Sequence, residues 1–312
     1  MRGSLQAVTR SSEEARIPSH GCALVADVYR PKGKGPHPAI VMAHGFGGIR
    51  RGGLPSFAGR FQAAGLVVVL FDYRHFGDSE GSPRQILSVP RQLQDWHAAL
   101  RFTRRLPDVD GSRVGLWGTS FSGGHVVRVA AEDENVAAVV AQVPFASGVR
   151  TVAKLPLRSA FKMAAAGLAD LVWSGILRGR PIQVPITGPP GSLAAMALNE
   201  AVEGAERLYR GCLWDNRVAA RVGLATLLYR PLRHAGHVRC PLLVQVGEHD
   251  SLTPPEPARA MARRAPRGET RSYPMGHFDA YFDDGFDAVV ADQVAFFRRH
   301  LAAPHALESS SG

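Results

Sequence analysis

The sequence has no apolar run that is long enough to cross a membrane. No stretch of 18 or more residues is both apolar and uncharged, and a membrane-spanning helix needs about 20 such residues. Residues 1–16, MRGSLQAVTRSSEEAR, also lack the apolar segment of a secretory signal. We therefore expect a cytoplasmic protein with no membrane span, unless a tag has replaced a signal peptide. The first residues, MRGS, and the last, LESSSG, are expected to be vector-derived.

Cysteine is scarce as well. The 312 residues include Cys22, Cys212 and Cys240 as the only cysteines, which is too few for a disulfide framework. No two of them have the spacing of metal ligands, so the sequence predicts neither a metal site nor a cofactor. Cys240 opens an apolar stretch and is expected to pack in the core.

Acidic residues are fewer than basic ones. The sequence has 37 lysines and arginines and 27 aspartates and glutamates, which gives a net charge of +10. The basic residues are dispersed, almost all are arginine, and they form no block of like charge. This is typical of a global compositional bias rather than of a nucleic-acid surface, so we expect no nucleic-acid partner. A weak preference for anionic substrates or surfaces stays open.

What the sequence does contain is an alternation of apolar strands, glycine turns and helical patterns. Continuous apolar runs such as 37–45 and 66–74 are typical of buried parallel strands, while 24–31 alternates like an early antiparallel strand. Helical spacing follows at 88–106 and again at 286–301. This order predicts an α/β fold with a mainly parallel sheet and helices on both faces.

The alternation stops between residues 148 and 235. Helix-like stretches at 161–177 and 217–229 flank a turn-rich segment at 181–192. We expect a discontinuous core, 1–147 and 236–303, with 148–235 inserted as a helical cap over the active-site end and 304–312 as a tail. The alternative is a second helical domain elsewhere on the surface.

A candidate nucleophile lies in GLWGTSFSGGHV, residues 115–126. Ser120 follows a predicted strand and precedes a predicted helix, which is the setting of the G-x-S-x-G nucleophile turn. Gly118 removes a side chain where the turn is tight. Ser122 replaces the last glycine of the pattern, but it is small, and Gly123 follows it.

A serine needs a base, and the base needs an orienting acid. His277 follows the last predicted strand and a glycine in YPMGHFDAYF, and it is preferred over His249 and His300. Asp250 opens the loop after the penultimate strand, with Glu248 as the second choice. Asp279 is too near His277 in sequence to be its usual partner.

Two backbone N–H groups are candidates for an oxyanion hole. One is that of Phe121, directly after Ser120. The other is that of Phe46 in the loop His44–Gly48, where glycines follow an early strand. The alternative is that these glycines only form a tight turn. His44 is expected to be a structural hydrogen-bonding group rather than a proton carrier.

These motifs together resemble the α/β-hydrolases from the first strand to the last helix. FDYRHFGDSEGSPRQ, WGTSFSGGHV, GEHDSLTPP and YPMGHFDAY resemble a subgroup with dienelactone-hydrolase-like, X-Pro-peptidase-like and polyketide-transferase-like members. The elbow of that subgroup reads G-x-S-[FY]-x-G, so the resemblance makes Ser122 a subgroup feature. It also implies a Ser120, Asp250, His277 triad and an oxyanion loop after the early strand.

Substrate-pocket candidates are large side chains near these motifs or in the cap. They are His75, Phe76, Trp173, Trp214 and Phe278. The two tryptophans have helix packing as the alternative. Asp72 and Arg74 are expected to form a structural ion pair with each other.

We therefore expect a serine hydrolase that cleaves carboxylic esters through an acyl-enzyme, acting on a hydrophobic or aromatic small molecule. The alternatives are an acyl transferase or thioesterase with the same triad, a peptidase or amidase, and a non-catalytic receptor on the same fold. A homodimer is one hypothesis for the assembly.

Overall fold

The computed structural model describes residues 12–153, 157–177 and 179–302. The ends that we expect to be vector-derived, including the tail 304–312, lie outside these ranges. Within them, no helix is both long enough and apolar enough to cross a membrane.

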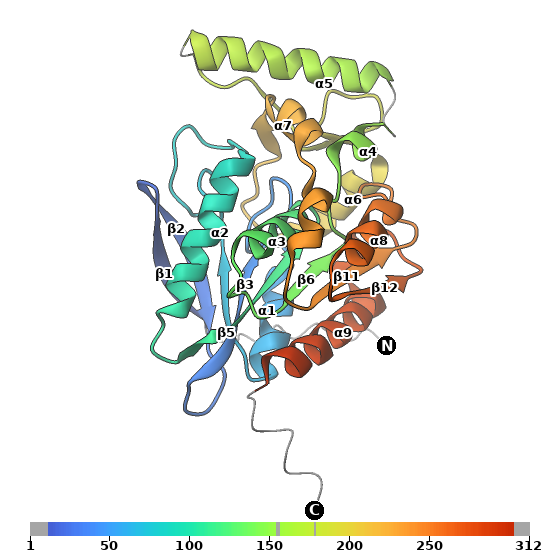
Figure 1. Cartoon of the computed structure of the whole chain (residues 1–312). Coiled ribbons are helices and arrows are strands. Elements are labelled where there is room, and N and C mark those ends of the chain that lie inside the picture. The colour runs from blue at the N-terminus through green and yellow to red at the C-terminus, as the bar shows by residue number, and fades with distance from the viewer. Residues whose placement is uncertain (1–11, 154–156, 178, 303–312) are drawn as a thin grey trace, which may run out of the picture.

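An eight-stranded sheet forms the centre of the molecule (Figure 1). Its strands, in spatial order, are β1 (Ser12–Ser19), β2 (Cys22–Tyr29), β4 (Val67–Phe71), β3 (His37–Ala43), β5 (Val109–Thr119), β6 (Val139–Gln142), β11 (Leu242–Gly247) and β12 (Gly268–Tyr273). From β4 to β12 every neighbouring pair is parallel, while β2 runs antiparallel to β1 and β4. The predicted α/β class is confirmed, and β1, which the sequence pattern did not indicate, extends one edge.

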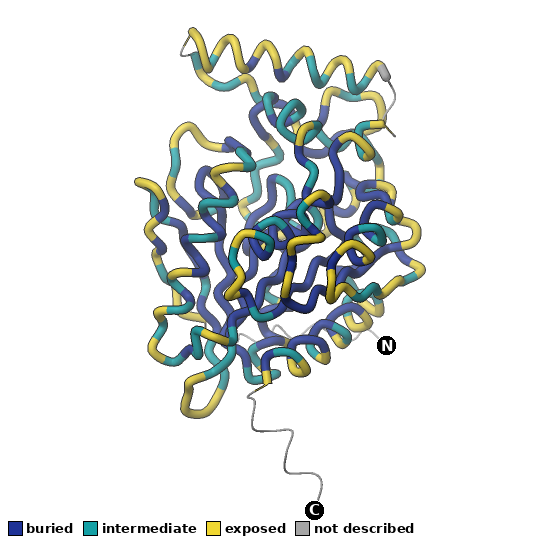
Figure 2. The backbone as a smooth tube through the Cα atoms, viewed as in Figure 1, coloured by how far each residue is buried: buried dark blue, intermediate teal, exposed yellow. Residues whose placement is uncertain are grey.

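Side-chain alternation along the central strands explains why both faces of the sheet are covered. On β3, Val41 belongs to the core of one face and Met42 to the core of the other. Helices α2 (Val89–Arg104), α3 (Phe121–Glu132) and α8 (Pro255–Arg264) pack on the first face, and α1 (Leu54–Ala63) and α9 (Asp283–Leu301) on the second. The continuous apolar runs of the sequence are therefore strands buried on both sides, and they form the dark centre of Figure 2.

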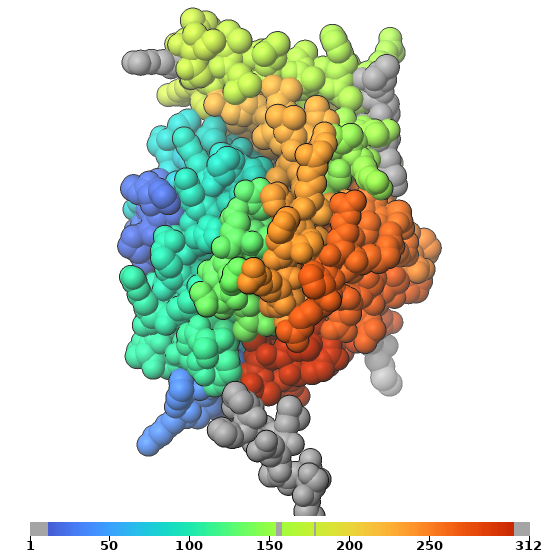
Figure 3. Space-filling view, viewed as in Figure 1, coloured from blue at the N-terminus to red at the C-terminus, as the bar shows by residue number. Residues whose placement is uncertain are grey.

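Residues 148–235, called the inserted segment below, contribute no strand to this sheet. The segment contains α4 (Gly148–Val152), α5 (Leu157–Asp170), the π-helical turns η1 (Leu171–Ile176), α6 (Asn199–Leu208), α7 (Val222–Leu228) and the 3₁₀ turns η2 (Pro231–His237), which runs on past residue 235. It also contains the short strands β7 (Gln183–Pro185), β8 (Thr187–Gly188), β9 (Met196–Ala197) and β10 (Arg217–Ala219) in two small sheets. In Figures 1 and 3, α5 lies across the top of the molecule with α7 and α4 beneath it.

The local structure of the inserted segment differs from its pattern in one place. The helical spacing of residues 217–229 predicts a single helix, whereas β10 occupies its first three residues and α7 begins at Val222. β10 pairs with β7, from the turn-rich stretch before it. Pairing with a distant strand has overridden the local helical preference.

Candidate active site

Ser120 lies on a sharp turn between β5 and α3. Its φ of 56° and ψ of −120° are unusual for a residue with a side chain, and such strain clusters at functional sites. Gly118 is required by this turn, because a Cβ there would lie 2.3 Å from the carbonyl oxygen of Ser122. The small residues of the motif thus hold the serine hydroxyl at the carboxyl end of the central strand.

Ser122 has a polar partner where a glycine is more usual. Its hydroxyl lies 2.6 Å from the hydroxyl of Tyr73, which also accepts a 2.7 Å hydrogen bond from the indole N–H of Trp96. All three side chains are buried. The hydroxyl of Ser122 therefore belongs to a core hydrogen-bond chain that the motif alone did not reveal.

The structure brings His277 and Asp250 to Ser120. Nε2 of His277 lies 3.1 Å from Oγ of Ser120, and Nδ1 lies 2.7 Å from Oδ2 of Asp250. The loop after β12 carries the histidine, and the loop after β11 carries the aspartate. With Nδ1–H donating to Asp250, Nε2 is free to accept the proton of the serine hydroxyl.

The charge pair is buried, and its pKa shifts follow from its contacts. Burial alone would lower the pKa of His277, but the charge of Asp250, its hydrogen bond and the charge of Glu200 together raise it. Burial would raise the pKa of Asp250, but the histidine and the hydrogen bonds from Thr253 lower it. The pair favours a protonated imidazole, which is what a base needs when it receives a proton.

Thr253 orients the carboxylate of Asp250. Its N–H and its hydroxyl donate to the two carboxylate oxygens at 2.7 and 2.6 Å, and the N–H of Leu252 donates at 2.8 Å. Thr253 was not among the residues predicted for the site. An aspartate followed three residues later by threonine is a local turn pattern that could have indicated it.

The loop after β3 passes directly over Ser120. A Cβ on Gly45 would lie 3.0 Å from Cβ of Ser120, so glycine permits the close approach. The rings of Phe46 and Phe121 meet edge to face at 5.5 Å. Among the described residues, no loop or side-chain hydrogen bond uses the N–H of Phe46. The N–H of Phe121 is in the first helical position, which has no partner within its helix. Both N–H groups are therefore available to a ligand.

His44 is buried, and its Nδ1 lies 3.0 Å from the carbonyl oxygen of Gly45.

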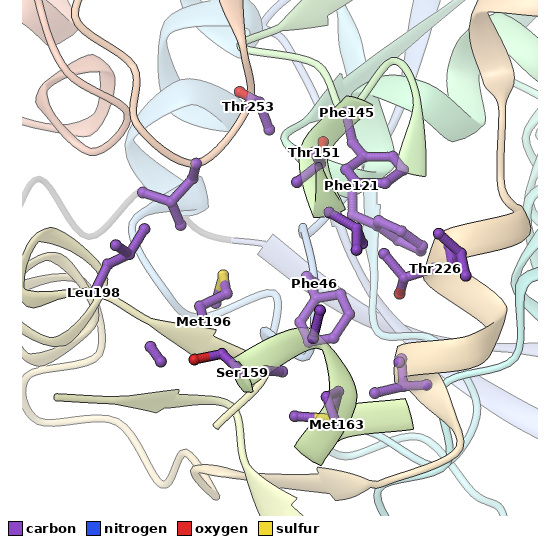
Figure 4. A pocket seen from close by; sticks show the side chains of 18 of the residues that line it. Phe46, Phe121, Phe145, Thr151, Ser159, Met163, Met196, Leu198, Thr226 and Thr253 are labelled. Atoms are coloured by element: carbon purple, nitrogen blue, oxygen red, sulfur yellow. The ribbon is translucent and has the colours of Figure 1, made fainter. Parts of the chain in front are cut away.

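Two cavities meet at Ser120. The larger one, of about 280 Å³, lies beneath α5 and α7 and is lined by apolar and hydroxyl side chains without a charged group among the described residues (Figure 4). The smaller one, of about 40 Å³, lies beside His277. Phe46, Ser120 and Met196 line both.

The pocket candidates divide between these cavities and other sites. Trp214 and Phe278 line the smaller cavity. His75 is buried with Nδ1 2.9 Å from the carbonyl oxygen of Pro83, Phe76 packs in the core, and half of the Trp173 side chain is exposed on η1. The structure thus places these last three away from both cavities. The sequence shows where such side chains lie along the chain, but it does not show which way they point.

The expected ion pair between Asp72 and Arg74 is wrong. Asp72 pairs with Arg50 at 2.6 Å, and Arg74 pairs with Asp95 of α2 at 2.6 Å. Side chains two apart in an extended chain point the same way, but each of these meets a nearer partner from another element. The runner-up acid Glu248 faces Arg259 at 3.5 Å.

The sheet, its helices and the strand–turn–helix site define the class as the α/β-hydrolase fold. The family model for serine aminopeptidase, S33 (Hydrolase_4), matches residues 34–300, and the chain therefore belongs to this family of hydrolases. The serine-hydrolase resemblance seen in the sequence is confirmed at this level.

Relatives and solved structures agree with this assignment. The chain is 39% identical over 300 residues to the quorum-quenching protein AidA of Acinetobacter baumannii, covering 96% of this chain and 98% of that protein. It is 28% identical to the thiohydrolase aneE of Aspergillus aculeatus, covering 96% of each. The α/β hydrolase GrgF of Penicillium sp. sh18 superposes with a TM-score of 0.82 at 24% identity, covering 94% of this chain and all of that one.

Proposed function

We propose that this hydrolase cleaves carboxylic esters of apolar acids through an acyl-enzyme on Ser120. The observation that carries the proposal is the line from Ser120 to His277 to Asp250 beside an uncharged apolar cavity. A serine hydroxyl within hydrogen-bond reach of an oriented imidazole is the arrangement that makes it nucleophilic.

The reaction follows from this geometry. Oγ of Ser120 attacks the ester carbonyl while Nε2 of His277 takes its proton, and the carbonyl oxygen becomes an oxyanion. The N–H groups of Phe46 and Phe121 donate to that oxyanion. The intermediate then expels the alcohol, which receives the proton from His277, and the acyl group stays on Ser120. Water, activated by the same histidine, hydrolyses the acyl-enzyme and restores the serine.

The two cavities suggest an orientation for the substrate. The leaving oxygen must lie at Nε2 of His277, and His277 lines only the smaller cavity. The leaving group would therefore enter the smaller cavity, whose aromatic lining includes Trp214 and Phe278. The acyl chain would extend into the larger one, where burial of each methylene contributes about 0.8 kcal/mol. The inserted segment acts in this proposal as the cap that excludes water from the acyl group.

Thioester cleavage or acyl transfer is the second candidate. The same groups would act on a thioester, and the relative aneE is named a thiohydrolase. The two candidates differ in the leaving group and in what accepts the acyl group. Product analysis in the presence of an added alcohol or amine separates hydrolysis from transfer.

The cavity supports aminopeptidase activity less well than ester cleavage, although the family is described as serine aminopeptidase. A peptide amino terminus is a cation, and burying it without a carboxylate partner is costly. The larger cavity has no charged residue among its described lining. A cavity without charged side chains favours an uncharged, apolar acyl group.

The test is hydrolysis of p-nitrophenyl esters from acetate to palmitate, with a fluorophosphonate probe for the serine. Ser120→Ala is expected to lower kcat by about 10⁴-fold or more and to abolish labelling. Ser122→Ala, two positions along the same turn, should keep both. If the wild-type protein labels but cleaves no ester, the thioester and transfer candidates lead. If it neither labels nor turns over, the proposal is wrong.

A further inference from the structure

Glu200, in the first turn of α6, reaches out of the inserted segment to the loops that hold the histidine and the aspartate. Its Oε1 accepts the backbone N–H of His277 at 2.7 Å, although 77 positions separate them in the chain. Its Oε2 accepts the hydroxyl of Ser251, the residue directly after Asp250. One carboxylate thus joins α6 to the loops after β11 and β12.

The loop of His277 is shaped to admit this carboxylate. A Cβ on Gly276 would lie 2.8 Å from Oε1 of Glu200, so glycine leaves the room that the contact needs. The N–H of Gly276 itself donates to Asp279 at 2.8 Å. Two successive N–H groups of this loop are therefore held by carboxylates, one from the loop and one from the inserted segment.

We propose that Glu200 is a positioning residue, which fixes the backbone of His277 and makes the reactivity of Ser120 depend on the seating of the inserted segment. The inference rests on the proposed function, in which His277 is the base. Catalytic geometry tolerates deviations of only about 0.5 Å. A loop residue reaches that precision when its backbone is held as firmly as its side chain.

The charge of Glu200 acts in the same direction as its hydrogen bond. Among the described residues, the charged side chains bonded to His277 are Asp250 from the loop after β11 and Glu200 from α6, and Asp279 of its own loop accepts the neighbouring N–H of Gly276. All three are acidic, while the elbow side contributes the neutral Ser120. The negative charge of Glu200 helps to raise the pKa of His277. It therefore favours the imidazolium that forms when the serine is deprotonated.

A merely structural role would look different from a positioning role. In the structural case, replacing Glu200 would change the melting temperature and leave the reactivity and pH dependence of the folded protein as they were. In the positioning case, the reactivity of Ser120 changes while the protein stays folded, and kcat changes more than KM. The rate of fluorophosphonate labelling is the better readout, because it does not depend on knowing the natural substrate.

The experiment compares Glu200→Gln, Glu200→Ala and a control, measuring labelling rate against pH, kcat and KM for an ester, and Tm. The control is Glu203→Gln, an exposed glutamate one turn further along α6. Glu200→Ala should lower the labelling rate and kcat by about tenfold, the loss expected for one charge-assisted hydrogen bond. Glu200→Gln keeps an acceptor for the N–H of His277 but removes the charge. Its labelling rate and kcat should therefore lie between those of Glu200→Ala and the wild type.

The pH dependence gives the second readout. Neutral His277 is the base, so labelling falls as pH drops through its pKa. Without the charge of Glu200 that pKa is lower, and the acidic limb of the Glu200→Gln profile should move to lower pH. Glu203→Gln should match the wild type in its labelling rate and in the pH at which its acidic limb falls.

Two failures are distinguishable. If the wild type labels and both Glu200 variants label at its rate with the same acidic limb, the positioning role is wrong while the proposed function stands. If the wild type itself does not label, the proposed function is wrong and the role of Glu200 falls with it. If Glu200→Ala does not fold, Glu200→Gln alone decides through its acidic limb.

Discussion

Ser122 belongs to the elbow motif by position, but its hydroxyl binds to the core. Its hydroxyl ends a buried chain that runs from Trp96 through Tyr73. The hydroxyl of Tyr73 accepts from the indole and shares a second hydrogen bond with the hydroxyl of Ser122. The serine is therefore hydrogen-bonded into the core as well as being a small residue beside a tight turn.

Ser122→Ala is expected to remove the hydrogen-bond partner of the buried Tyr73 hydroxyl. A buried polar group that loses its partner costs about 1–3 kcal/mol, so the free energy of unfolding should fall by that amount. Urea unfolding of the variant beside Tyr73→Phe with Ser122→Ala tests this, since removing both partners should cost less than removing one. An unchanged unfolding free energy would show that the hydrogen bond carries no net stability.

The helix α5 has an inner face toward the larger cavity and an outer face toward solvent. Ser159, Ala160, Met163 and Ala164 line the cavity, and Figure 4 shows Met163 pointing into it. The outer face exposes Phe161 and Leu168. The two faces follow from helical spacing, and the small residues of the inner face leave the room that the acyl chain would occupy.

Ala164→Phe is expected to shorten the acyl pocket. Since each methylene contributes about 0.8 kcal/mol, kcat/KM should fall by roughly tenfold for every two methylenes excluded, while acetate esters are cleaved as before. Ala165→Phe, on the exposed side of the same helix, is the matched control and should keep the wild-type chain-length profile. Equal profiles for both variants would place the acyl chain elsewhere.

Across the whole molecule, Arg50 joins distant parts of the chain through buried ion pairs. Its guanidinium is fully buried and pairs with Asp72 at 2.6 Å and with Asp27 of β2 at 2.9 Å. Its backbone N–H also donates to Asp72 at 2.6 Å. Burial would lower the pKa of Arg50, but these carboxylates raise it well above its ordinary value.

Arg50→Met is expected to lower the free energy of unfolding by about 3–5 kcal/mol, because it leaves buried Asp72 without its cation. Arg51→Met is the neighbouring control. Arg51 is largely exposed and pairs with Asp78 at 3.1 Å, so its loss should cost about 1 kcal/mol or less. Chemical denaturation of the two variants measures the contrast, and similar losses would refute the assigned role of the buried network.

The sequence by itself determined the order of the central strands and their helices, though not β1 or β10, and the positions of Ser120, Asp250 and His277 after predicted strands. These features depend on neighbouring residues. A buried strand needs a continuous apolar run, and a sharp elbow needs small residues beside it. Such requirements are met within about ten residues of the chain.

Only the tertiary structure decided which side chains meet. It paired Asp72 with Arg50 and Arg74 with Asp95, turned Trp173 outward, and brought Glu200 to the backbone of His277. Each of these contacts joins residues at least 20 positions apart or depends on which way a side chain points. Pair formation over such distances depends on how whole elements pack, and the local pattern of either partner does not contain that information.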